Sequence, residues 1–133
     1  MEYAKFIVTF LLVSCFSCQS TSTKEQPITD YTIRSPLGKK LSPATPPPKL
    51  LEKYEQAKKD YLKDKHNVEN IIWLGRRTAY LGRLKEAIQI YTDGIAKFPA
   101  DARLYRHRGH RYISIREYDK AIQDFQKAVQ LIE

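Results

Sequence analysis

The sequence predicts an all-α protein made of antiparallel helical hairpins, with an N-terminal segment that stays outside the folded part. Two observations predict this class. Apolar residues recur at helical spacing from Lys49 onward, and the chain is similar to itself at an offset of 34 residues. The chain has 133 residues, so residues 49–133 are expected to form one small helical domain.

An apolar run over residues 6–13 lies near the start of the chain and leads into the sequence LVSC, whose cysteine is Cys15. The run is shorter than the roughly 20 residues that a helix needs to span a membrane, so it is interpreted as a secretory signal. The LVSC sequence resembles the lipobox of bacterial lipoproteins. This resemblance implies a signal peptide over residues 1–18, with acylation at Cys15 or, as the poorer alternative, at Cys18.

The alternatives are a disulfide between Cys15 and Cys18 or an uncleaved hydrophobic tip. These are the two cysteines of the chain, whereas an exported disulfide-bonded domain would place cysteine pairs within its fold. Two or three acyl chains anchor a protein stably where a single chain does not. We therefore expect a lipid anchor in the cell envelope, on the periplasmic or outer-membrane face.

Residues 19–48 are predicted to be a disordered linker. They are rich in Ser, Thr, Lys and Pro and have no helical or strand period. The four prolines at its end favour an extended and stiff final portion. These prolines are Pro43, Pro46, Pro47 and Pro48.

A first helix is predicted over residues 49–63, because apolar residues follow one helical face there. That face consists of Leu50, Tyr54, Ala57 and Tyr61. Asn67 can cap the next helix with its side chain. The spacing of the first three apolar residues matches that of Ala121, Phe125 and Ala128, so this helix is expected to cap the repeats as half of a degenerate copy.

Two repeats are predicted, over residues 68–101 and 102–133. At an offset of 34 the identical pairs include Gly75 with Gly109 and Ala87 with Ala121, and a large aromatic residue follows each alanine by four positions. This period and this alternation of small and large residues resemble the tetratricopeptide repeat (TPR). The resemblance implies helix packing through Gly75, Ala87, Tyr91, Pro99, Tyr105, Gly109, Tyr112, Ala121, Phe125 and Ala128.

Two positions depart from that pattern. Arg108 stands where a leucine is commonest and is expected to be structural, and the turn glycine Gly82 becomes Arg116 in the second copy. Asp101 is expected to cap the first helix of that copy, after Pro99 has ended the preceding helix.

No catalytic or cofactor site is predicted. His107 and His110 lie three residues apart on one helix, a spacing that can serve a metal. However, arginines surround them and no carboxylate or thiolate does. Since no acid pair, no nucleophile with a base and no phosphate-binding glycine loop is found, we expect neither enzyme activity nor a cofactor.

A basic groove is predicted on the concave side, which the first helix of each hairpin lines in stacked repeats. Its expected residues are Arg76, Tyr80, Arg103, Arg106 and His110, with Glu69, Ile72, Ala79 and Ile113 in the same two stripes. Guanidinium groups bind carboxylates bidentately, so the predicted ligand is a peptide or protein that carries carboxylates. The alternative is that the arginines only solvate the surface or pair with Asp119 and Asp124.

The function predicted from these features is a non-catalytic, membrane-anchored scaffold for protein–protein interaction in a bacterial cell envelope. The alternative is a nucleic-acid-binding repeat protein that uses the basic cluster between Arg103 and Arg111, near Tyr105 and Tyr112. The export signal argues against that alternative. A third possibility is a role in assembling an envelope enzyme complex. The apolar side of the last helix predicts self-association or continuation into a longer repeat array.

Overall fold

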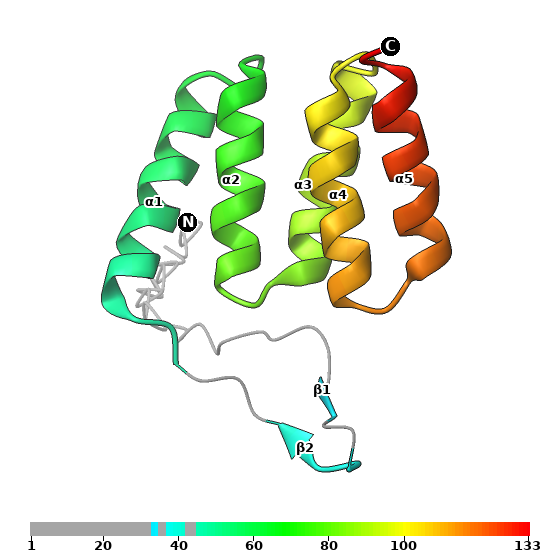
Figure 1. Cartoon of the computed structure of the whole chain (residues 1–133). Helices are drawn as coiled ribbons and strands as arrows, with labels where there is room; N and C mark the ends of the chain where they lie inside the picture. Colours follow the sequence, from blue (N-terminus) through cyan, green and yellow to red (C-terminus); the bar gives the residue numbers. More distant parts are fainter. Residues whose placement is uncertain (1–32, 35–36, 42–44) are drawn as a thin grey trace, which may run out of the picture.

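The computed structural model describes residues 33–34, 37–41 and 45–133 (Figure 1). The predicted signal peptide, Cys15, Cys18 and most of the predicted linker lie outside these residues. The described part contains five helices, which confirms the predicted all-α class. They are α1 (Pro48–Lys63), α2 (Val68–Tyr80), α3 (Leu84–Lys97), α4 (Ala102–Ser114) and α5 (Tyr118–Gln130).

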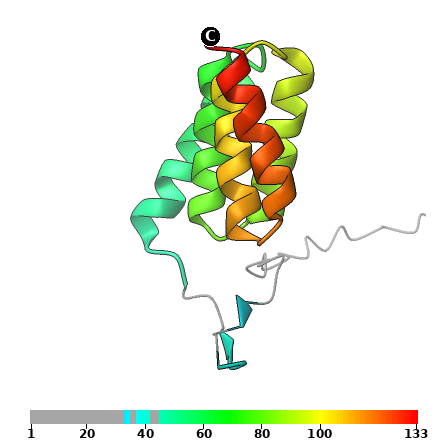
Figure 2. The same ribbon diagram turned by 45° about the vertical axis from the view of Figure 1, so that its right-hand side comes forward.

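The helices form a row of antiparallel neighbours in which each packs on the next along the chain (Figure 1). In addition, α2 packs against α4, which is not its neighbour along the chain. The α4–α5 hairpin therefore stacks on the α2–α3 hairpin, and it lies in front of that hairpin in Figure 2. Because of this stacking, the first helices of the two hairpins share one surface.

Side chains cap the first helix of each hairpin, as the sequence predicted. The Asn67 side chain accepts a hydrogen bond from the amide of Glu69 at 2.9 Å, and Asp101 accepts one from the amide of Arg103 at 3.0 Å. The first amides of a helix have no partner within it, so each cap satisfies one of them. Pro48 begins α1, where its missing N–H costs nothing.

The core is centred on the α2–α3 hairpin, and Leu104 of α4 joins it. Its most deeply buried large side chains are Tyr91, Ile71, Leu104 and Thr78. The predicted apolar face of α1 packs against α2, since Tyr54 and Ala57 are buried and Leu50 and Tyr61 are partly buried beside them.

The expectation that Ile72 and Ala79 line the groove was wrong. They are only 4% and 6% exposed. Both belong to the core cluster that also contains Tyr91 of α3 and Leu104 of α4. Because α3 and α4 both pack on α2, they cover the part of α2 that a single hairpin would leave open.

Glycine in the first helix of each hairpin allows an aromatic ring of the second helix to approach closely. A Cβ atom on Gly75 would lie 2.5 Å from Cζ of Tyr91, and one on Gly109 would lie 2.9 Å from Cε1 of Phe125. The two rings thus occupy the space that any larger residue would need.

Both hairpin turns place a residue with positive φ at the same repeat position. Gly82 has a φ of 80° and Arg116, 34 residues later, has a φ of 64°. Glycine adopts this conformation freely, whereas an L-residue with a side chain is strained there. The second turn therefore keeps the geometry of the first without the residue that favours it.

Residues 33–34 and 40–41 depart from the prediction of a disordered linker. They form strands β1 (Ile33–Arg34) and β2 (Lys40–Leu41), which pair antiparallel. Gly38, between them, has a φ of 77°, which glycine allows in a tight turn. This two-residue ladder stands apart from the helices and does not change the fold class (Figure 1).

None of the described helices is both long and apolar enough to cross a membrane.

Candidate functional site

An open cleft of about 380 Å³ lies where α2 and α4 share a surface. We call it the cationic cleft. It brings together four of the five residues predicted for the groove, and it adds His107 and Arg111. Its lining consists of Arg76, Tyr80, Arg106, His107, His110 and Arg111.

Helical spacing accounts for this convergence. Arg76 and Tyr80 are four residues apart on α2, and the α4 residues lie within five positions of each other, so each set shares one side of its helix. Arg76 donates a hydrogen bond from Nη2 to the Tyr80 hydroxyl at 3.4 Å. That bond, together with nearby arginine charges, lowers the pKa of Tyr80, although partial burial opposes the shift.

The cleft is lined with positive charge and contains no carboxylate. Arg76, Arg106 and Arg111 make no ion pair with any carboxylate in the described part of the chain. In addition, Nε of Arg111 is buried without a hydrogen-bond partner. Because that nitrogen has no accessible surface, the anionic ligand is favoured by the charge of the three guanidinium groups, which have no carboxylate partner in the described residues.

The two histidines of the cleft are held against aromatic rings. His107 stacks on Tyr91 with ring centroids 5.8 Å apart, and His110 makes a T-shaped contact with Phe125 with ring centroids 5.2 Å apart. Burial, followed by the charges of Arg106, Arg76 and Arg111, lowers the pKa of His107 to about 4. Burial and the neighbouring arginines also lower the pKa of His110. Both rings are therefore neutral near pH 7, and each can offer a ring N–H to a ligand.

The described residues contain no group of three His, Cys, Asp or Glu side chains that could hold a metal ion. His107 was considered from sequence only as a metal ligand and was not placed in the groove. The signal available in the sequence was its position three residues before His110 and one after Arg106.

Arg103 was predicted to line the groove, but it lies outside the cationic cleft. Its guanidinium forms ion pairs with Glu69 on α2 and with Asp101, the cap of its own helix. The charge-assisted bond to Asp101 holds the pKa of that carboxyl below its usual range. Because Glu69 and Arg103 occupy the same position in successive repeats, they link the two first helices instead of presenting a free charge.

Similar proteins were found by sequence and by structure. The chain is 45% identical over 51 residues to the human protein named Tetratricopeptide repeat protein 13, a match that covers 38% of this chain and 6% of that protein. A solved structure described as MamA MSR-1 C2 superposes with a TM-score of 0.54 at 24% identity. That match covers 61% of this chain and 49% of the other. No family profile matches the chain.

The fold is of the TPR type. The chain thus spans a small part of the human protein and about half of the MamA chain.

One departure from the TPR pattern has a direct structural explanation. Arg108 donates from Nε and Nη2 to the two carboxylate oxygens of Asp124 on α5, each at 2.8 Å, and from Nη1 to Oγ1 of Thr92 on α3 at 3.0 Å. It therefore connects three helices. Asp124, which was considered as a partner for the groove arginines, is thus bound by Arg108, and no groove arginine pairs with Asp119 or Asp124 among the described residues.

The other residues with expected packing roles lie along the hairpin contacts of the TPR-like domain. Ala87, Ala121 and Ala128 are buried. The Tyr105 hydroxyl donates to the carbonyl of Pro99 at 3.0 Å. The Arg108 guanidinium lies 5.8 Å from the ring centroids of both Tyr105 and Tyr112, so these two rings flank the buried ion pair.

Proposed function

We propose that this chain is a non-catalytic protein-interaction module and that its cationic cleft binds an extended, acidic segment of a partner protein. The observation that carries the proposal is the convergence of Arg76, Arg106 and Arg111 on a cleft without carboxylates. The TPR-type fold supports it, because stacked helical hairpins offer extended binding surfaces.

The chemistry of the cleft favours carboxylates. A guanidinium group is always charged near neutral pH and offers parallel N–H donors that match the two oxygens of a carboxylate. The imidazole groups of His107 and His110 add donors without adding charge. Binding should therefore weaken as salt increases, since the contacts lie at an exposed surface.

The same charges could attract nucleic acid, which is the alternative function. Base recognition by such a surface would need exposed aromatic rings on which bases can stack. Tyr105 and Tyr112, the rings nearest the basic cluster in sequence, lie beside the Arg108 guanidinium and outside the cleft. Tyr80 of the cleft is itself exposed, so the protein ligand is favoured instead by the pairing of Arg103 and Arg108 with carboxylates, which leaves two arginines of the basic cluster unpaired.

Replacing Arg106 and His110 together by glutamine is expected to weaken binding of a fluorescein-labelled hexaglutamate peptide about tenfold. Loss of one charge-assisted contact is worth roughly 1.4 kcal/mol, which is a factor of ten. Fluorescence anisotropy measures the affinity, and circular dichroism checks that helicity is unchanged.

Hexaglutamine and the variant Lys59→Gln are the controls for this experiment. Lys59 is exposed on α1, away from the cleft, so its replacement removes one charge and no cleft contact. Equal weakening by Lys59→Gln, or a wild-type protein that does not distinguish the two peptides, would contradict the proposed cleft ligand. A single-stranded oligonucleotide that competes at lower concentration than hexaglutamate would favour the alternative.

We also propose that a lipid on Cys15 attaches the module to the bacterial cell envelope. This rests on the resemblance of the LVSC sequence to a lipobox. Full-length protein expressed in a bacterium is expected to enter the detergent phase on Triton X-114 partitioning, and Cys15→Ala is expected to remain uncut and to lose the lipid label. Cys18→Ala is the matched control and should behave as wild type. Normal cleavage and labelling of the Cys15→Ala protein would show that the site is wrong.

A further inference from the structure

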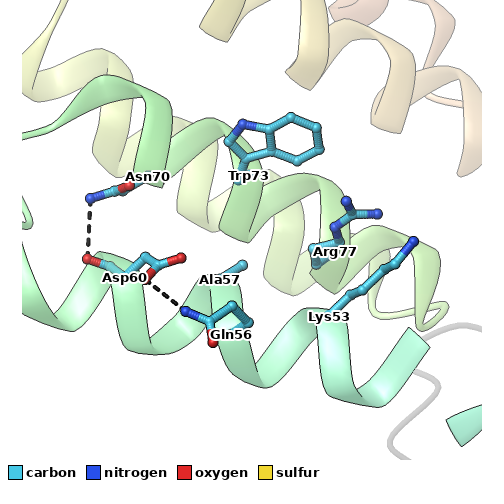
Figure 3. A pocket seen from close by; sticks show the side chains of 7 residues that line it. All are labelled: Lys53, Gln56, Ala57, Asp60, Asn70, Trp73 and Arg77. Atoms are coloured by element: carbon cyan, nitrogen blue, oxygen red, sulfur yellow. Dashed lines mark hydrogen bonds between the residues drawn. The ribbon is translucent and has the colours of Figure 1, made fainter. Parts of the chain in front are cut away.

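A second cavity, of about 290 Å³, lies between α1 and α2 (Figure 3). We call it the Trp73 pocket. Ala57 of α1, which is buried, forms part of its floor, and the indole of Trp73 stands over it. Lys53 and Arg77 lie together at one end, and Gln56, Asp60 and Asn70 lie toward the other (Figure 3).

The polar groups at the second end are already engaged with one another. Gln56 donates to the carboxylate of Asp60 at 2.9 Å, and Asn70 donates to the backbone carbonyls of Asp60 and Asp64 at 3.1 and 3.2 Å. By contrast, Lys53 and Arg77 make no ion pair with a described carboxylate. The pocket therefore offers an apolar centre beside two available positive charges.

The indole is exposed but held in place. Trp73 keeps 40% of its surface accessible. The guanidinium carbons of Arg76 and Arg77 lie 4.4 and 4.9 Å from its ring centroid, distances at which cation–π attraction is effective. A fixed aromatic surface loses little conformational entropy on binding, which is the property of an anchor site.

The Trp73 pocket and the cationic cleft adjoin along α2. Trp73, Arg76, Arg77 and Tyr80 have the spacing of a single helical face. Arg76 lines the cleft and also contacts the indole that lines the pocket, while Arg77 of the pocket lies 5.9 Å from the ring of Tyr80 in the cleft. One ligand can therefore contact both sites.

We infer that the Trp73 pocket takes an apolar, preferably aromatic, side chain of the same acidic peptide that the cationic cleft binds. This inference rests on the proposed function and specifies its ligand. Trp73 and Tyr80 are seven positions apart on one helix, which is about 10 Å along its axis. An extended peptide covers that distance in about three residues. The ligand is thus a segment in which an aromatic residue lies about three positions from a run of Asp or Glu.

The test uses the full chain and two fluorescein-labelled peptides. One carries phenylalanine three residues from a run of four glutamates, and the other carries glycine in place of the phenylalanine. Wild-type protein is expected to bind the phenylalanine peptide about tenfold more tightly. Trp73→Ala should bind both peptides equally. Tyr118→Ala is the matched control, because Tyr118 is an exposed aromatic residue on α5, and it should keep the preference.

Trp73 is the single tryptophan of the chain, so its emission reports on the pocket without any substitution. Unlabelled phenylalanine peptide is expected to shift the emission to shorter wavelength and to reduce its quenching by acrylamide. The glycine peptide should do neither.

Several results would overturn the inference. The inference is overturned if wild-type protein binds both peptides with equal affinity and its tryptophan emission does not change. The proposed function of the cleft still stands in that case if the double variant Arg106→Gln with His110→Gln weakens binding of the glycine peptide. Failure of both peptides to bind overturns the proposed function as well. Retention of the preference when phenylalanine is moved five residues farther away shows that one extended ligand does not span both sites. A concentration-dependent emission shift without peptide shows that a second copy of the chain fills the pocket instead.

Discussion

Replacing Asp124 with alanine is expected to lower the free energy of unfolding by about 3 kcal/mol, because it leaves the Arg108 charge without its partner. The side chains of Arg108 and Asp124 are only 17% and 7% exposed. Water therefore cannot fully replace the two lost hydrogen bonds. Urea unfolding followed by circular dichroism measures the change.

Two further variants separate the cost of the unpaired charge from the value of the pair. Asp119→Ala removes an exposed carboxylate of the same helix and should cost less than about 1 kcal/mol. Arg108→Leu with Asp124→Leu should lie within about 1 kcal/mol of wild type, since a buried ion pair can be exchanged for apolar packing. In that variant Thr92 still donates its hydroxyl to the carbonyl of Ile88 at 2.8 Å. A double variant as unstable as Asp124→Ala would show that the pair itself stabilises the fold.

Gly75→Ala is expected to destabilise the protein by about 2 kcal/mol. In an open helix this change would be stabilising by about 1 kcal/mol. Here, however, the new Cβ would lie 2.5 to 2.9 Å from three atoms of the Tyr91 ring and hydroxyl, and Tyr91 is 1% exposed. A ring enclosed in this way can move only by displacing the surrounding core, so overpacking outweighs helix propensity.

Gly109→Ala is the internal control for that prediction. Its Cβ would lie 2.9 to 3.2 Å from atoms of Phe125, whose ring is only partly buried and can move toward solvent. We expect a change within about 1 kcal/mol of wild type. The two thermal midpoints should therefore differ, with the Gly75 variant lower. Equal midpoints would show that enclosure of the ring does not decide the effect.

The sequence was informative wherever one residue type determines one local geometry. Asn67 and Asp101 predicted the starts of two helices, because a short polar side chain caps a helix in one way. The 34-residue pattern predicted an all-α fold of hairpins, because it repeats small and large residues where helices must meet. Arg76, Tyr80, Arg106 and His110 could be assigned to one side of the domain from helical spacing together with the way in which hairpins stack in the repeat.

The sequence was less informative wherever the position of a side chain depends on contacts with other helices. Helical spacing placed Arg103 in the groove, but Glu69, which is 34 residues earlier, and Asp101 both bind it. Helical spacing also predicted that Ile72 and Ala79 would be exposed in the groove, whereas the neighbouring helices α3 and α4 bury them. His107 shares its side of α4 with His110, but its stacking on Tyr91 is a contact between helices that periodicity within one helix does not predict.

The backbone conformation of Arg116 could not be predicted from the sequence either. A glycine at this turn position is readable from sequence, as at Gly82, but an arginine with a φ of 64° is not. The α4–α5 contact holds the turn in that conformation although the residue disfavours it.

The linear order of the helices also determines which of them unfold locally at the lowest free-energy cost. Among the described helices, the backbone of α1 lies close to that of α2 alone and the backbone of α5 lies close to that of α4 alone, whereas each of the three central helices has neighbours on both sides. Side chains of α1 such as Tyr61 also reach Lys97 of α3. In such a linear arrangement, free energy is shared between nearest neighbours, and the outermost units open at the lowest cost. Fraying of α1 would dissolve one wall of the Trp73 pocket and leave the cationic cleft assembled. The cationic cleft should therefore stay folded for a larger fraction of the time than the Trp73 pocket. Amide hydrogen exchange should be faster in α1 than in the residues of α2 and α4 that line the cleft.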